Sequence, residues 1–255
     1  MIRWSHSRDK DVRTCERRVF LKQRFASSRA DHDSARFRAY VLKKSIDAPA
    51  WAGKIVHEVI KNQIVPTLRK GNGPDFQRAR EFALDLLARQ ESFSRDRKYL
   101  QITQTTAGPD FCVLRPHTTG IGDTLDLISK ATQLVLNALE ILEHRQEPLL
   151  AELQSPGDLF AEKEIRFTIA DVMVEAVPDI LFINRQGRVL ILDWKLWLGS
   201  SSSAEQLHVY AYAFLRSGWW RGISLERLRL CEANLITGAV VVLRSALRRF
   251  GYHRT

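Results

Sequence analysis

The spacing of apolar residues changes part-way along the chain from a helical period to a strand period. Up to residue 154, apolar side chains recur every three or four positions, which is typical of amphipathic helices. Helices are expected over residues 9–26, 50–70, 75–91 and 121–144. Residues 27–47 are polar and predict no defined element, and Ser155, Pro156 and Gly157 end the helical part.

After this break the pattern favours β-structure. Strands are expected over residues 159–169, 171–183, 188–195 and 234–243, with a helix over 204–217 between the last two. Helices followed by a three-stranded meander, a helix and a further strand give the order αβββαβ, which is typical of an α/β sandwich. The fold class is therefore α/β.

The length bounds the domain organisation. A chain of 255 residues can form one well-packed domain with a subdomain. We expect residues 1–255 to be a single domain, with a core from about 48–70 and 158–245. The helical residues 72–150 are expected to pack beside it.

The stretch from Pro178 to Lys195 predicts a β-hairpin with charged residues at its open end. If residues 185–187 form the loop, Gly187 supplies the positive φ that such loops need. Counting outward from the loop pairs Asp179 with Asp193. Side chains alternate along a strand, so Lys195 shares the face of Asp193 and Trp194 points the other way.

Two acids and an ammonium would therefore meet at one place on the sheet. Adjacent carboxylates repel each other unless a positive charge neutralises them, and carboxylate oxygens suit Mg²⁺ or Mn²⁺. The alternative is a solvated strand end without function, which is the usual meaning of an isolated Asp-x-Lys.

These residues resemble the signature of the PD-(D/E)xK nuclease superfamily. Pro178 and Asp179 followed by Asp193, Trp194 and Lys195 are similar to its core motif. Four further segments resemble its RecB-type branch, which includes CRISPR-adaptation and AddB-like nucleases: Gly53 to His57 (G-x-x-x-H), Gln206 to Tyr210 (Q-x-x-x-Y), Ser5 to Arg8, and Cys15 to Arg18. The resemblance covers residues 1–65 and 160–215 and implies a restriction-endonuclease-like αβββαβ core with an additional helical region.

The resemblance also implies roles for individual residues. Asp179, Asp193, the carbonyl of Trp194 and the imidazole of His57 would hold the metal. Lys195 would orient or activate the attacking water, and Gln206 and Tyr210, four apart on one helix face, would support the site.

Three alternatives remain open for these residues. His57 could be a hydrogen-bonded core histidine, and Lys195 could be the ion-pair partner of Asp193 or Asp179. Gln206 also fits a capping box with Ser203 as N-cap. Gly53, one turn before His57, indicates either a close backbone approach or a tolerated glycine.

Cysteine content argues against a cluster that some members of the branch hold. An iron–sulfur cluster needs four thiolates, whereas this chain has three cysteines. We expect no iron–sulfur cluster, and Cys15 is interpreted as a small apolar residue in a helix.

Charge and hydropathy indicate the partners. The net charge of +10 favours a polyanion such as nucleic acid, although the basic residues are spread along the sequence. There is no signal-peptide pattern and no apolar run of membrane-spanning length, so we expect a cytoplasmic protein without a membrane partner.

Together these observations predict a metal-dependent nuclease that hydrolyses phosphodiester bonds, with DNA as the expected substrate and another protein as recruiter. Phage defence and DNA repair are both compatible. The alternative is a nucleic-acid-binding or partner-docking subunit whose nuclease is silent or gated without its partner.

Overall fold

The structure, a computed structural model, describes residues 2–196, 203–218, 223 and 225–243. The chain divides into two compact units, which are described separately. One unit comprises Met1–Asp9, Ile60–Asp75 and Glu140–Thr255, and the other comprises Lys10–Val59 and Phe76–Leu139. Whether they act as a single domain stays a prediction.

The first unit contains a five-stranded mixed sheet in the order β2-β5-β6-β7-β8. All neighbours are antiparallel except β6 and β7, which are parallel and are connected through helix α11 (Ser203–Arg216). The strands are β2 (Gly157–Ala161), β5 (Ile180–Asn184), β6 (Val189–Lys195), β7 (Leu228–Asn234) and β8 (Val240–Leu243).

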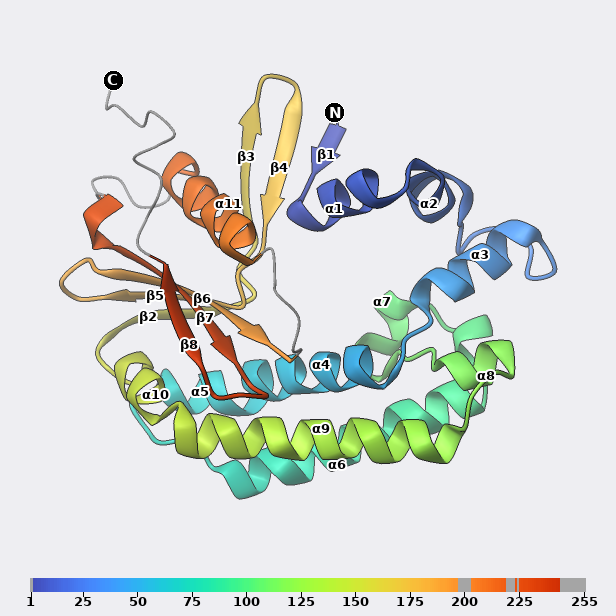
Figure 1. The fold of residues 1–255 in the computed structure, drawn as a ribbon, viewed down its shortest axis with the longest axis horizontal. Coiled ribbons are helices and arrows are strands. Elements are labelled where there is room, and N and C mark those ends of the chain that lie inside the picture. The colour runs from blue at the N-terminus through green and yellow to red at the C-terminus, as the bar shows by residue number, and fades with distance from the viewer. Residues whose placement is uncertain (1, 197–202, 219–222, 224, 244–255) are drawn as a thin grey trace. The chain divides into compact units, whose positions relative to one another are not determined.

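Helices cover both faces of this sheet. Figure 1 shows α11 on one face and, on the other, α5 (Val65–Leu68) and α10 (Glu147–Leu153). The strands alternate accordingly, because Val189 and Ile191 belong to the same buried cluster as Leu207 and Phe214 of α11. The face that carries Asp193 and Lys195 is therefore the face that α11 covers.

A second, three-stranded sheet lies beside α11 (Figure 1). Its order is β1-β4-β3, with β1 parallel and β3 antiparallel to the central β4. Phe167 of β3 packs edge-on against Tyr212 of α11, with ring centroids 5.4 Å apart. The strands are β1 (Ile2–Trp4), β3 (Ile165–Ile169) and β4 (Val172–Ala176).

The second unit is helical. Its longest elements are α6 (Phe76–Arg95) and most of α9 (Thr124–Arg145). Trp51 of α4 is fully buried, and its indole donates a 2.8 Å hydrogen bond to Gln90 of α6. The remaining elements are α1 (His6–Thr14, shared with the first unit), α2 (Glu16–Phe20), η1 (Leu21–Phe25), α3 (Ala35–Lys44), α4 (Ala48–Val59), η3 (Lys98–Leu100), α7 (Gln104–Ala107), η4 (Gly108–Asp110) and α8 (Arg115–Thr119).

The predicted α/β class is confirmed, but several boundaries were wrong. Three strands were expected between residues 159 and 195, but the structure has five, β2 to β6. The chain breaks at Glu162, whose φ is 48°, and at Pro178. The range 234–243 contains only the last residue of β7, a turn with Gly238 at φ 77°, and β8, and the rest of β7 was not expected. The polar residues 27–47 contain the helix α3.

The helix expected over residues 9–26 is divided at Cys15. Cys15 has an extended backbone and precedes α2, and the next segment, η1, has π-helical geometry. Cys15 therefore lies outside the helices and is exposed, so its interpretation as a small apolar residue in a helix was wrong.

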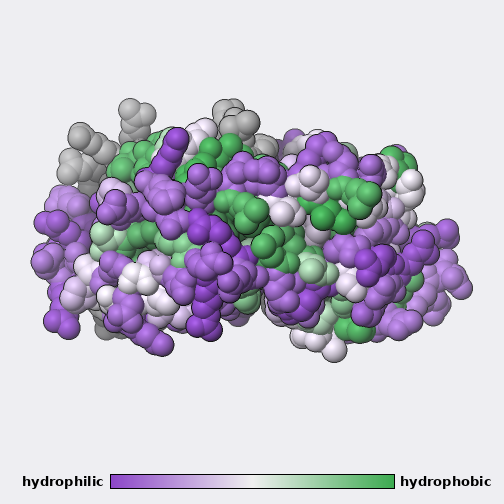
Figure 2. Space-filling model, turned by 90° about the horizontal axis from the view of Figure 1, so that it is seen from below, coloured by the Kyte–Doolittle hydropathy of each residue, from purple (hydrophilic) through white to green (hydrophobic). Residues whose placement is uncertain are grey.

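Hydrophilic residues cover most of the molecular face in Figure 2, with hydrophobic patches between them. No helix within the described ranges has both the length and the apolar character needed to cross a lipid bilayer.

Candidate active site

The hairpin that joins β5 to β6 has the predicted register. Asn184 donates its backbone N–H to the carbonyl of Arg188 at 3.0 Å, and Gly187 in the loop has a φ of 71°. The side chain of Asn184 accepts from the amide of Arg188 at 2.9 Å, which holds the turn together. Ile180 pairs with Leu192, so the next positions outward, Asp179 and Asp193, face each other as predicted.

Asp179 is held from both sides at the entry to β5. Its backbone carbonyl accepts a 3.0 Å hydrogen bond from the amide of Glu162, at the end of β2. Its carboxylate accepts a 2.7 Å bond from the amide of Trp194. These contacts fix the carboxylate against β6.

Asp193 and Lys195 lie at the end of β6, which has a partner strand on each side. Asp193 is only 2% exposed, and its carboxylate forms an ion pair with the ammonium of Lys195. A buried carboxylate is costly unless it is paired, so this contact stabilises Asp193 in its charged form. The ion-pair alternative for Lys195 is thus compatible with the structure, as is a catalytic role.

Trp194 points to the opposite face, as predicted, and is 3% exposed. Trp51 is likewise buried. Both side chains pack in the interior and are not accessible to a ligand.

Gln206 of α11 connects the charged residues of the site. Its amide oxygen accepts a 3.1 Å hydrogen bond from the ammonium of Lys195, and its amide nitrogen donates to Asp193 at 3.4 Å. The same nitrogen donates to the hydroxyl of Tyr210, one turn later. One planar amide therefore fixes the orientation of the lysine, the aspartate and the tyrosine relative to one another.

The capping alternative for Gln206 is not resolved by these contacts, because the side chain of Ser203 lies outside the described residues.

Tyr210 remains a neutral hydroxyl. Burial raises its pKa above the usual value of 10.0, and the negative charge of Asp193 raises it further, outweighing the donated hydrogen bond from Gln206. The hydroxyl accepts from Gln206 and keeps its own proton, so Tyr210 adds no third negative charge beside Asp179 and Asp193.

His57 belongs to the helical unit, in α4, where it is half-buried. Its role as a metal ligand stays a prediction. A Cβ built on Gly53 meets no described atom within 4 Å, so close packing within the protein does not explain this glycine.

Lys61 lies beside the site and was not expected there. Lys61 of η2 (Ile60–Ile64) forms a 2.5 Å ion pair with Glu162, whose amide holds Asp179. No periodic sequence pattern signals this pair, because 101 residues separate its two partners.

The donor set at this position fits a hard divalent cation. Asp179 and Asp193 offer carboxylate oxygens on one face, and hard ions accept carboxylates and carbonyls. Within either unit, the described residues contain no group of three His, Cys, Asp or Glu side chains placed to hold an ion. A metal bound in the first unit would therefore be held by two carboxylates together with backbone carbonyls or solvent.

Adjacent strands of a mixed sheet thus present two aspartates and a lysine, which the crossover helix holds in place. Such an arrangement can place a divalent cation beside an ammonium, which is what hydrolysis of a phosphodiester needs. Residues 3–242 match the PD-(D/E)XK nuclease superfamily, and the chain belongs to it. Nucleases of this superfamily generally use divalent ions such as Mg²⁺ or Mn²⁺, which agrees with the donor set. The comparison with curated proteins returned no match.

Proposed function

We propose that this protein is a metal-dependent nuclease of the RecB-type branch that hydrolyses phosphodiester bonds in DNA. The observation that carries the proposal is the convergence of Asp179, Asp193 and Lys195, held together by Gln206. Superfamily membership gives this arrangement its chemical meaning. The order of the motifs from Gly53 to Tyr210 supports the assignment to the branch.

Asp179, Asp193 and the carbonyl of Trp194 would hold the ion, and the family resemblance suggests the imidazole of His57 as a further ligand. A bound divalent ion neutralises phosphate oxygens and makes a bound water more acidic.

The chain's own residues supply orientation and charge. The side chain of Lys195 is 21% exposed, so its ammonium can reach a phosphate while Gln206 fixes its direction. A positioned ammonium stabilises the negative charge that develops on the phosphate during hydrolysis. Tyr210, being neutral, anchors the amide of Gln206 without competing for the lysine.

The second candidate is a nucleic-acid-binding subunit whose nuclease is gated by a partner protein. The ion pair between Lys195 and Asp193 favours this gated subunit, because a lysine paired with its neighbour must reorient to meet a substrate. Phage defence and DNA repair are both compatible with either candidate.

The test is cleavage of linear duplex, circular duplex, single-stranded DNA and RNA, each with Mg²⁺, Mn²⁺ or EDTA. Wild type, Lys195→Ala and the exposed control Lys70→Ala are compared. We expect metal-dependent cleavage of DNA that is lost in Lys195→Ala and retained in Lys70→Ala. Equal cleavage by Lys195→Ala would contradict the proposed role, and a silent wild type that still binds DNA would favour the gated subunit.

A further inference from the structure

Most of the excess positive charge of the chain lies in one short segment. Residues 10–44 contain eleven basic and four acidic residues, a net charge of 11 − 4 = +7, against +10 for the whole chain. This segment forms the last part of α1 and all of α2, η1 and α3. The basic side chains that look scattered along the sequence are therefore concentrated on one helical region.

This region contains a groove of about 390 Å³. Apolar side chains of Leu21, Ala39 and Leu42 line it together with Cys15, and basic side chains contribute their stems and charged ends. The basic lining residues are Arg17, Arg18, Lys22 and Lys43. The groove therefore combines apolar walls with four cations.

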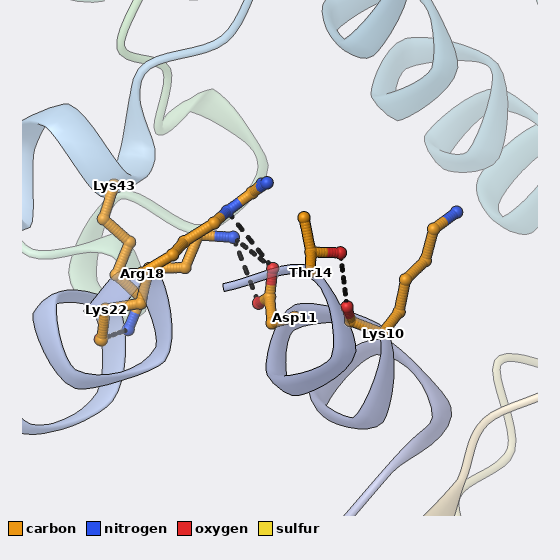
Figure 3. Close-up of polar contacts among 6 residues, drawn as sticks. All are labelled: Lys10, Asp11, Thr14, Arg18, Lys22 and Lys43. Carbon is orange, nitrogen blue, oxygen red and sulfur yellow. Dashed lines mark hydrogen bonds and ion pairs between the residues drawn. The ribbon is translucent and has the colours of Figure 1, made fainter. Parts of the chain in front are cut away.

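The cations are held in defined positions (Figure 3). Arg18 and Lys22 both point at the carboxylate of Asp11, at 3.3 Å and 2.9 Å, and Lys43 of α3 donates a 2.6 Å hydrogen bond to the carbonyl of Lys22. Lys43 thereby ties the two walls of the groove together. One carboxylate cannot neutralise four cations, so the groove keeps a positive potential.

The backbone at the groove is also unusual. Leu21 and Lys22 lie in the π-helical segment η1, a rare geometry that is frequent at functional sites. None of the side chains described for α2 and η1 is buried, so core packing does not account for this geometry.

We propose that this groove binds a single-stranded segment of nucleic acid. Phosphates would contact the basic side chains, while the apolar walls would accept the faces of unpaired bases, which a duplex keeps stacked and inaccessible. Charge complementarity favours a polyanion, and the choice of nucleic acid among polyanions rests on the proposed nuclease function. The groove would hold substrate without taking part in the chemistry at Asp179 and Asp193.

The first test is binding of a fluorescent oligonucleotide, single-stranded or duplex, in EDTA over a range of salt concentrations. Arg17→Gln/Lys43→Gln removes two cations, and we expect the slope of log affinity against log salt to fall by about 1.4 for the single strand. Leu42→Gln should weaken single-strand binding about fivefold or more, with duplex binding unchanged. The matched controls are the exposed Lys130→Gln of α9 and Leu84→Gln of α6.

The second test needs no substitution. Cys15 is exposed and lines the groove, so its rate of alkylation reports occupancy. We expect a single-stranded oligonucleotide to slow this reaction and polyglutamate of equal charge to leave it unchanged.

Unchanged binding by both groove variants would overturn the proposal, as would equal effects on duplex and single strand. Equal protection by polyglutamate would assign the groove to an acidic protein instead. These binding measurements do not depend on cleavage. If the groove binds single strands but the protein never cleaves nucleic acid, the nuclease proposal fails and the groove proposal stands.

Discussion

Replacing Gln206 with leucine separates the two interpretations of this residue. The substitution removes the acceptor that lies 3.1 Å from the ammonium of Lys195 and the donor to Asp193 and Tyr210. A hydrogen bond to a charged group contributes about 1.5–3 kcal/mol. At about 1.36 kcal/mol for each factor of ten, loss of the lysine's orientation should slow cleavage about 10- to 160-fold.

The assay measures kcat and KM for cleavage alongside urea denaturation of the same preparation. We expect the loss mainly in kcat, because Gln206 directs the lysine rather than binding the substrate. The control is Gln133→Leu on α9, because Gln133 is exposed and its amide donates a 2.8 Å hydrogen bond to Asn137, away from any charged group of the site. A loss of about 0.5–2 kcal/mol in stability with unchanged kcat would refute the reasoning and identify Gln206 as a capping residue.

Three further predictions concern thiols, pH and backbone packing. Alkylation followed by mass spectrometry should modify Cys15 in the folded protein but Cys112 only after unfolding, because burial raises the pKa of Cys112 to about 12. Since the pKa of Tyr210 is raised in the folded state, its contribution to stability is complete below its usual pKa of 10.0 and is lost as pH rises above it. Above that pH, the unfolding free energy of the wild type should therefore fall more steeply than that of Tyr210→Phe, by up to about 1.4 kcal/mol per pH unit. Urea titrations of both proteins at each pH measure this difference. Gly157→Ala should cost about 1–3 kcal/mol in the same assay, because its Cβ would clash with the backbone of β5, whereas Gly53→Ala should stabilise by up to about 1 kcal/mol.

The candidate site was more predictable from the sequence than the sheet around it. A hairpin fixes its own register, so the glycine at position 187 was enough to place Asp179 opposite Asp193. The period of a helix likewise placed Gln206 and Tyr210 on one face. Both inferences depend only on local geometry.

The remaining features depend on contacts that are distant in sequence. The breaks at Glu162 and Pro178 assign neighbouring strands to different sheets, and an apolar pattern is similar on both sides of such a break. The ion pair of Lys61 with Glu162 spans a hundred residues and leaves no periodic signal. For the same reason, a count of basic residues did not show that Arg17 and Lys43 line one groove.

The central position of β6 has a consequence for how the protein loses activity. Asp193 to Lys195 pair with Glu232 to Asn234 of β7, and the amide of Trp194 also donates to Asp179. Their amides should therefore exchange with solvent only when the sheet itself opens. The segment around α2 and η1, whose described side chains are all at least partly exposed, should open at a much lower free energy. Mild denaturant should then uncouple the two properties: capture of long single strands would fail first, while hydrolysis at the sheet would persist until global unfolding.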